Sequence, residues 1–251
     1  MAEPFNIPYT KQTITGGATD RRSWSRMVLT GLLLTLAAIL LACSGEPQEE
    51  RAGNRPAPGE AAFEGTIVAM GDSLTAGLGV DEDQAYPAQL ARRLEAAGRQ
   101  FRVINAGVSG ETSSGALSRL QWVIASLDPD IVILVTGAND GLRGIDPKVL
   151  ESNLDQLISG LKKANIQIVL AGMRMLPNLG PDYIEAFATI YPALADKHQV
   201  IFMPFFLDGV AGETEYNQAD KIHPTAAGYG RIVDNLYPYV IDAIERDRQA
   251  R

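Results

Sequence analysis

The feature that most constrains the fold is a run of five aliphatic residues, Ile131–Val135, with no polar side chain among them. A strand that is buried on one face alternates apolar and polar residues, whereas an unbroken apolar run predicts burial on both faces. Similar short runs recur along the chain, and the strands that they predict are 66–70, 101–105, 130–136, 166–171 and 200–203. Strands buried on both faces are typical of a parallel sheet that is covered by helices.

Helical patterns fill the segments between and after these strands, at 86–97, 113–126, 147–164, 181–197 and 225–245. Pro147 suits the first turn of its helix, and Gly98 suits the end of another. This alternation predicts one α/β domain, with a parallel sheet wrapped by helices on both sides. Sites in such sheets form at the carboxyl ends of the strands, so functional residues are expected in the loops at those ends.

The first sixty residues carry an export pattern rather than part of this domain. Arg21, Arg22 and Arg26 precede an apolar run at 27–42, which is shorter than the roughly 20 residues of a membrane span. The run ends at Cys43, the only cysteine, in a sequence that resembles the lipobox of bacterial lipoproteins. We therefore expect a lipid on Cys43; the alternative is a cysteine that follows an ordinary signal by chance.

These features divide the chain into three parts. Residues 1–42 are interpreted as a signal peptide of the lipoprotein type, 43–62 as the lipidated cysteine with a flexible tether, and 63–251 as the folded domain. Sec and twin-arginine export both remain open. The expected location is a membrane, on its periplasmic side. Ser44 stands where an Asp would suggest inner-membrane retention, which favours the outer membrane if the organism is Gram-negative.

The charge and the possible metal ligands narrow the class of partner. The formal net charge is −8, and an acidic surface repels the phosphate backbone of nucleic acids. Two histidines and one cysteine are too few for a zinc site built from these ligands, and a single cysteine excludes an intrachain disulfide. We expect no nucleic acid partner and no metal.

Polar residues and glycines follow the predicted strands where a site is expected. Ser73 follows the first strand, Gly110 lies in a glycine-containing loop after the second, and Asn139 follows the third with an amide that can donate to an anionic oxygen. Asp220 precedes His223 by three residues, a spacing that lets a carboxylate reach the imidazole within one loop. Each loop taken singly is also compatible with a plain turn or a helix cap.

Taken together, four segments carry a family resemblance. In chain order they read GDSLTAGLGV, NAGVSGETS, GANDGLRG and DKIHPTAAGY. With them the chain resembles the SGNH (GDSL) hydrolase family, and within it the bacterial group called acyl-CoA thioesterase I, lysophospholipase L1 or arylesterase. The similarity runs from about residue 65 to residue 244. It implies the SGNH hydrolase fold, a flavodoxin-like three-layer α/β/α sandwich with a five-stranded parallel sheet.

The resemblance also implies a role for each residue of the pattern. Ser73 is the nucleophile, His223 takes its proton and later gives it to the leaving group, and Asp220 orients His223. The implied oxyanion hole consists of the backbone N–H groups of Ser73 and Gly110 and the side-chain amide of Asn139. The reaction would be hydrolysis of a carboxylic ester through an acyl-enzyme, with no metal or cofactor.

Apolar residues near these loops are candidates for contact with the substrate. Leu142 and Ile145 follow Asn139, and Met175 and Leu176 follow the fourth strand; they suit an acyl chain, with core packing as the alternative for the methionine. The resembled group acts on acyl and aryl esters, thioesters and lysophospholipids, so a small-molecule or lipid ester is the expected partner. Two alternatives are a carbohydrate O-deacetylase on the same scaffold and a lipoprotein that binds lipids or glycans without turnover.

Three further polar residues are interpreted as structural. His198 lies at the end of a predicted helix, where we expect it to be solvated or to act as a C-terminal cation. Asp72 and Asp140 are interpreted as residues that hold their loops in place, and not as a catalytic pair of carboxylates.

Overall fold

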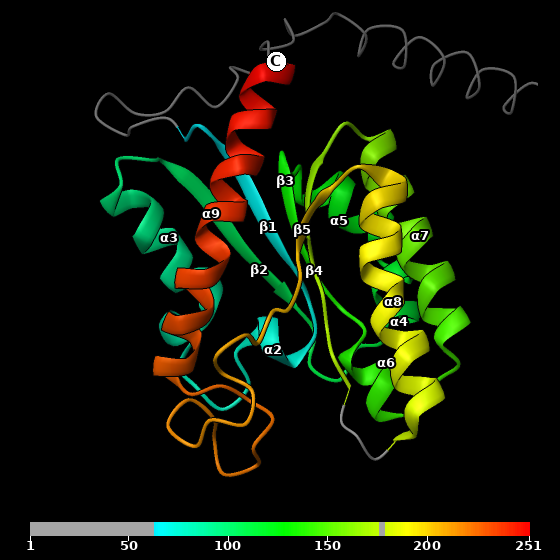
Figure 1. The fold of residues 1–251 in the computed structure, drawn as a ribbon. Coiled ribbons are helices and arrows are strands. Elements are labelled where there is room, and N and C mark those ends of the chain that lie inside the picture. Colours follow the sequence, from blue (N-terminus) through cyan, green and yellow to red (C-terminus); the bar gives the residue numbers. More distant parts are fainter. Residues whose placement is uncertain (1–62, 176–178) are drawn as a thin grey trace, which may run out of the picture. The chain divides into compact units, whose positions relative to one another are not determined.

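A five-stranded parallel sheet lies at the centre of the computed structural model, which describes residues 63–175 and 179–251 (Figure 1). The strands are β1 (Gly65–Gly71), β2 (Phe101–Gly107), β3 (Ile131–Val135), β4 (Gln167–Ala171) and β5 (Ile201–Met203). Their order across the sheet is β2-β1-β3-β4-β5, and every neighbouring pair is parallel. The predicted α/β fold with five parallel strands is confirmed, and each strand lies within two residues of its predicted ends.

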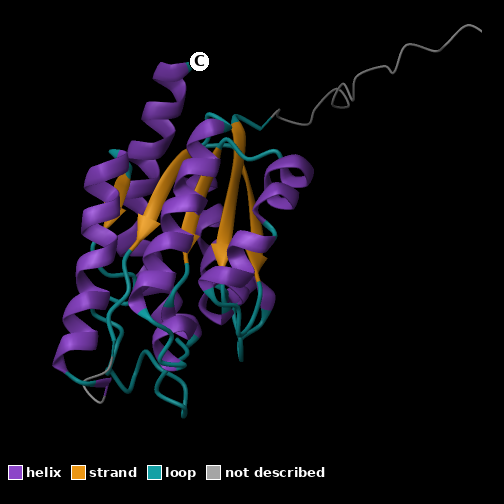
Figure 2. Cartoon of the chain, turned by 90° about the vertical axis from the view of Figure 1, so that its right-hand side faces the viewer, coloured by secondary structure: helices purple, strands orange, loops and turns teal. Residues whose placement is uncertain are grey.

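Helices form a layer on each side of this sheet (Figures 1 and 2). On one side α3 (Tyr86–Ala96) packs against α9 (Ala226–Ala250). On the other side α7 (Pro147–Lys163) packs against α8 (Pro181–His198) and α4 (Ser113–Ser118). The remaining helical segments are α2 (Ser73–Ala76), α5 (Leu120–Leu127), α6 (Ala138–Leu142) and the short 3₁₀ helix η1 (Glu82–Gln84).

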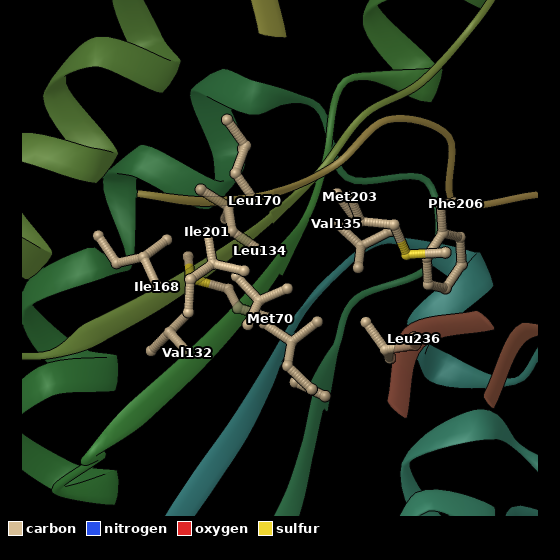
Figure 3. Packing of buried hydrophobic residues seen from close by; sticks show 14 of the residues in the cluster. Met70, Val132, Leu134, Val135, Ile168, Leu170, Ile201, Met203, Phe206 and Leu236 are labelled. Atoms are coloured by element: carbon tan, nitrogen blue, oxygen red, sulfur yellow. The ribbon is translucent and has the colours of Figure 1, made fainter. Parts of the chain in front are cut away.

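The core explains why the unbroken apolar run is informative. All five residues of β3 are fully buried, and alternate residues face the two helical layers. Figure 3 shows side chains of β1, β3, β4 and β5 packed together, with Leu236 of α9 nearby. Full burial of one such aliphatic side chain contributes about 1.5–3 kcal/mol, so this central layer is a large part of the driving force for folding.

Two predicted helices differ from the structure. The last one, expected to end at residue 245, continues to Ala250 in α9, and another is divided into two. The segment 113–126, expected to be continuous, is two helices, α4 and α5, which meet at Arg119. Arg119 leaves helical geometry (φ −103°, ψ 3°), and its guanidinium makes two 2.7 Å hydrogen bonds to the carboxylate of Glu111. The break therefore coincides with a fixed, largely buried ion pair beside the loop that contains Gly110.

The described residues belong to one compact unit of the chain. Within residues 63–175 and 179–251, no helix combines the length and the apolar character that a membrane span requires. The predicted signal peptide, Cys43 and the tether lie outside the described residues, and so does Leu176.

Candidate active site

Ser73 lies at the carboxyl edge of the sheet, in the first turn after β1. The strand ends at Gly71, and Asp72 begins α2 by accepting a 3.0 Å hydrogen bond from the backbone N–H of Leu74. The turn is tight, because a Cβ atom on Gly71 would lie 2.4 Å from the carbonyl oxygen of Val135. The sequence Gly-Asp-Ser thus places the serine as the first residue of a short helix, with only 9% of its surface exposed.

The hydroxyl of Ser73 meets a histidine from the other end of the chain. Its Oγ lies 2.9 Å from Nε2 of His223, and Nδ1 of His223 lies 2.7 Å from Oδ2 of Asp220. A carboxylate only accepts hydrogen bonds, so Nδ1 carries the proton and Nε2 is the nitrogen that can accept from the serine. This arrangement suits proton removal from a hydroxyl.

The carboxylate of Asp220 is 45% exposed at the side chain, yet it is held firmly in its charged form. Its Oδ1 accepts hydrogen bonds from the backbone N–H groups of His223 (3.0 Å) and Ile222 (2.9 Å). These two bonds, together with the one from the imidazole, lower the pKa of Asp220 to about 2. Asp220 therefore stays ionised as the partner of His223 over the whole pH range in which a histidine titrates.

Gln218 ties the loop of His223 to the segment that follows Ser73, and the sequence analysis did not identify it. Its backbone N–H donates to the carbonyl oxygen of His223 (2.8 Å), and its amide donates to the carbonyl oxygens of Leu78 (2.8 Å) and Pro224 (2.9 Å). Since the bond to Leu78 joins segments 140 residues apart, no local pattern could have revealed it.

Gly110 and Asn139 come from two other loops at the same edge and line one cavity with Ser73 and His223. Gly110 has a left-handed backbone (φ +78°), a conformation that favours glycine, and its carbonyl oxygen accepts a 2.6 Å bond from Arg143. The Nδ2 atom of Asn139 donates to Oδ2 of Asp72 (3.2 Å). The structure thus brings together all five residues of the predicted pattern.

A buried polar network fixes these two loops to each other. Asp140, which is fully buried, accepts from the backbone N–H of Ser113 (2.8 Å) and from its hydroxyl (2.5 Å). The amide of Asn153 on α7 donates to the hydroxyls of Ser113 (2.9 Å) and Ser114 (2.8 Å). Asp140 therefore joins the loop after β3 to the start of α4, which agrees with its interpretation as a residue that holds a loop.

Asp72 is a second buried carboxylate, directly beside Ser73. It is 1% exposed, and this burial raises its pKa to about 6, against the opposing effect of the hydrogen bonds from Leu74 and Asn139. The two bonds use different oxygens, Oδ1 for the backbone of Leu74 and Oδ2 for the amide of Asn139. Asp72 thus caps α2 and orients the amide of Asn139 at once.

The cavity over these residues has a volume of about 500 Å³ and mostly apolar walls. Of the residues predicted to contact substrate, Leu142 and Met175 line it. Ile145 does not, contrary to the prediction, because the chain turns back after α6: its N–H donates to the carbonyl oxygen of Asp140 (2.9 Å), and its carbonyl oxygen accepts from Tyr183 (2.7 Å). Lining residues that were not predicted from the sequence include Leu78, Arg174, Phe205, Leu207, Lys221 and Ile222.

The second histidine lies elsewhere. Nε2 of His198, the last residue of α8, lies 2.6 Å from Oδ1 of Asp155 on α7, and the His198 side chain is only 12% exposed. The expected place at a helix end is correct, but the side chain is buried against α7 rather than solvated. Among residues 63–175 and 179–251, no cluster of three or more His, Cys, Asp and Glu side chains is placed to hold a metal ion.

The comparisons with known proteins agree with this geometry. Residues 69–231 match the model of the GDSL-like lipase/acylhydrolase family. The chain is 41% identical over 173 residues to esterase TesA of Pseudomonas aeruginosa, covering 69% of this chain and 86% of that protein. It is 37% identical over 174 residues to thioesterase 1/protease 1/lysophospholipase L1 of Escherichia coli K12, covering 69% of this chain and 82% of that protein.

Solved structures of esterases share the fold of this chain. The crystal structure of TesA superimposes with a TM-score of 0.68 at 40% identity, over 71% of this chain and 99% of that one. The psychrotrophic esterase EstA from Pseudoalteromonas sp. gives 0.69 at 31% identity, over 72% of this chain and 100% of that one. Fold and site together define a serine ester hydrolase of the α/β class. The chain belongs to the GDSL-like lipase/acylhydrolase family.

Proposed function

We propose that this chain hydrolyses carboxylic esters through an acyl-enzyme on Ser73, with His223 as general base and acid and Asp220 as the residue that orients it. The observation that carries the proposal is the continuous set of hydrogen bonds from Asp220 to His223 (2.7 Å) and from His223 to Ser73 (2.9 Å). These residues lie at an apolar cavity that has room for an acyl group next to the hydroxyl of Ser73.

In the first half of the reaction, Oγ of Ser73 attacks the carbonyl carbon while Nε2 of His223 takes the hydroxyl proton. The bond between the carbonyl carbon and the leaving group then breaks, and Nε2 gives the proton to the leaving-group oxygen or sulfur. In the second half, water attacks the acyl carbon and gives a proton to Nε2. The bond between the acyl carbon and Oγ of Ser73 then breaks, Nε2 returns its proton to Oγ, and the acid is released.

The negative oxygen that forms in each half needs donors in fixed positions. We assign this role to the backbone N–H groups of Ser73 and Gly110 and to the amide of Asn139. The orientation of Asn139 supports the assignment. One N–H of its amide donates a hydrogen bond to Asp72, which fixes the nitrogen, and not the oxygen, on the side of Asp72 and Ser73. The second N–H of the same amide remains to serve the substrate.

The cavity favours an acyl or aryl ester with a substantial apolar part. Its walls include Leu142, Met173, Met175, Phe205 and Leu207. Relatives are named esterase, arylesterase and thioesterase/lysophospholipase, and we extend acyl esters, aryl esters, thioesters and lysophospholipids to this chain as proposed substrates. Export, if it occurs, argues against acyl-CoA as the physiological substrate, because CoA thioesters are cytosolic.

A series of p-nitrophenyl esters tests this proposal. The purified protein should hydrolyse the butyryl and octanoyl esters with a higher kcat/KM than the acetyl ester, because longer chains bury more apolar surface. A fluorophosphonate probe should label Ser73. A strong preference for acetyl would favour a carbohydrate O-deacetylase instead, and absence of both turnover and labelling would favour a binding lipoprotein.

We propose separately that the enzyme is exported and held on a membrane by a lipid on Cys43. The proposal rests on the sequence of residues 1–43: arginines, an apolar run, and the only cysteine in a sequence that resembles a lipobox. Metabolic labelling with a clickable fatty acid should mark the wild-type protein and fail to mark Cys43→Ser. An unmodified Cys43 in the intact mass of the exported protein would contradict the anchor.

A further inference from the structure

The charged residues in the wall of the cavity are unusual for this chain. The chain has a formal net charge of −8, yet the two exposed charged side chains that line the cavity, Arg174 and Lys221, are both cations. The one carboxylate in the wall, Asp72, is buried and occupied by Leu74 and Asn139. The side chains that face the open part of the cavity therefore combine an apolar surface with positive charge.

Lys221 is held in this wall by an unfavourable backbone conformation. Its φ is +61°, in the left-handed region that costs a residue with a Cβ roughly 1–2 kcal/mol. The other described non-glycine residues with positive φ follow helix ends: Asp128, Asn165 and Gln199. Lys221 instead lies between Asp220 and His223, where its N–H donates to the carbonyl oxygen of Gln218 (2.9 Å). Backbone strain of this kind is concentrated at functional sites.

Arg174 is presented differently, on the loop after β4. Its guanidinium carbon lies 4.7 Å from the centre of the Phe205 ring, a cation–π contact that positions the group at the wall of the cavity. Other cations near the site are already used: Arg119 pairs with Glu111, and Arg143 donates to Gly110. Within the described part of the chain, neither Arg174 nor Lys221 makes an ion pair or a side-chain hydrogen bond.

We propose that Lys221 and Arg174 form a subsite for an anionic group, a phosphate or a carboxylate, on the leaving group of the ester. The proposal rests on the function proposed above. The leaving group must lie on the side of His223, which protonates it, and Lys221 is two residues from His223 in the same loop. Arg174 adds a second positive charge in the wall of the same cavity.

Two esters that share an acyl group test the subsite: p-nitrophenyl butyrate and 3-carboxy-4-nitrophenyl butyrate, which differ by one carboxylate on the leaving group. The measured quantity is the ratio of kcat/KM for the anionic ester to that for the neutral ester. We expect Lys221→Asn, which removes the charge but suits a left-handed backbone, to lower this ratio about tenfold. Arg174→Met should lower it severalfold, and Lys221→Arg should largely preserve it.

Two controls separate the subsite from general electrostatics. Lys148→Met removes an equal charge on α7, outside the wall of this cavity, and should leave the ratio unchanged. The p-nitrophenyl monoester of glutaric acid carries its carboxylate on the acyl side, so Lys221→Asn should affect it much less. The proposal would be overturned if the ratio stayed at the wild-type value in the double variant Lys221→Asn/Arg174→Met. It would also be overturned if Lys221→Asn lowered kcat/KM for the glutaric monoester as much as for the ester with the anionic leaving group.

A binding measurement keeps this test separate from catalysis. The product 5-hydroxy-2-nitrobenzoate should bind the wild-type protein more tightly than p-nitrophenol in calorimetry, and the difference should vanish in the double variant Lys221→Asn/Arg174→Met. If the protein bound the product in this way but hydrolysed no ester, the subsite would stand and the proposed function would fail. If the wild-type protein bound both phenols equally, the subsite would be refuted whatever the activity.

Discussion

Each of the two histidines of the chain has an aspartate as its immediate partner. His223 lies 2.7 Å from Asp220, and His198 lies 2.6 Å from Asp155; both histidine side chains are mostly buried. They differ in what else surrounds them. His223 reaches Ser73 at a cavity, whereas Asp155 also binds Lys197 (2.7 Å), and the group joins α7 to α8.

This difference shows that an aspartate–histidine pair is not in itself a catalytic unit. At Asp155, hydrogen bonds from Lys197 and His198 lower the pKa of the carboxyl, so this carboxylate serves a contact between two helices. At Asp220 the carboxylate is fixed by backbone N–H groups, which leaves the imidazole to serve Ser73. The catalytic pair is distinguished from the structural pair by a third residue, Ser73, and by the cavity beside that serine.

The largest expected effect comes from removing the nucleophile, Ser73, or its general base, His223. Ser73→Ala and His223→Gln should each lower kcat roughly 10⁴–10⁶-fold in a folded protein, as the loss of a nucleophile or its base does. His198→Gln, the matched change at the other pair, should leave kcat/KM within about twofold. Steady-state kinetics on one aryl ester decides both. An active Ser73→Ala protein, or an inactive His198→Gln protein, would mean that the catalytic role has been assigned to the wrong aspartate–histidine pair.

Removing the proposed oxyanion donor should have the next largest effect. Asn139→Ala should lower kcat about 10²–10³-fold with a much smaller change in KM, because the amide serves the transition state more than the bound ester. The comparison with Ser73→Ala is made on the same substrate. A change confined to KM would place Asn139 among the substrate-binding residues instead.

Asp72→Asn should act through Asn139. The bonds from Leu74 and Asn139 go to different oxygens of Asp72, and an asparagine offers an oxygen at only one of these positions. The amide of Asn139 therefore loses its fixed orientation, and kcat should fall about tenfold. In a protein that already carries Asn139→Ala, the same change should have little effect. Equal losses in the two backgrounds would mean that Asp72 only supports the fold.

The same substitution should also change how stability depends on pH. Burial raises the pKa of Asp72 to about 6 from an ordinary value of 3.8, so the folded protein binds this proton more tightly than the unfolded chain. The wild type therefore loses stability as the pH rises from about 4 to 6, and Asp72→Asn does not. Relative to wild type, the free energy of unfolding of Asp72→Asn should rise over this range, by at most roughly 3 kcal/mol, in urea titrations. A constant difference over this range would mean that burial does not raise the pKa of Asp72.

The smallest effect is expected at the structural pair. Asp155→Asn weakens the bonds to Lys197 and His198 and should lower the free energy of unfolding by about 1 kcal/mol or less, since the carboxylate is partly exposed. The thermal midpoint, measured beside that of wild type, checks this prediction. Activity should stay near the wild-type level; a large loss would connect α7 and α8 to the site.

The sequence predicted the elements whose cause is local and missed those whose cause is distant. β3 could be predicted because its five apolar side chains need burial on both faces, whatever surrounds them. The break at Arg119 could not, because it coincides with an ion pair to Glu111, eight residues earlier. Ile145 was selected for its place after Asn139, but the turn after α6 directs it to Tyr183.

The same distinction holds within the site. Asp220 and His223 lie in one loop, so their spacing alone indicates that they can meet. Ser73, Gly110 and Asn139 were grouped by the resemblance and by the rule that parallel strands end at one edge. Gln218, Arg174 and the bond between Asp72 and Asn139 involve packing between loops that are far apart in sequence, for which the chain carries no short pattern.

The separation of Ser73 and His223 has a consequence for synthesis of the protein. The serine follows the first strand, the histidine precedes the last helix, and 150 positions lie between them. At about 5–20 residues per second, the ribosome makes the serine many seconds before the base that activates it. A nascent or truncated chain that lacks the histidine loop has a serine but no base to activate it. Recovery of activity during refolding should therefore report docking of the histidine loop against Ser73, and not formation of the sheet alone.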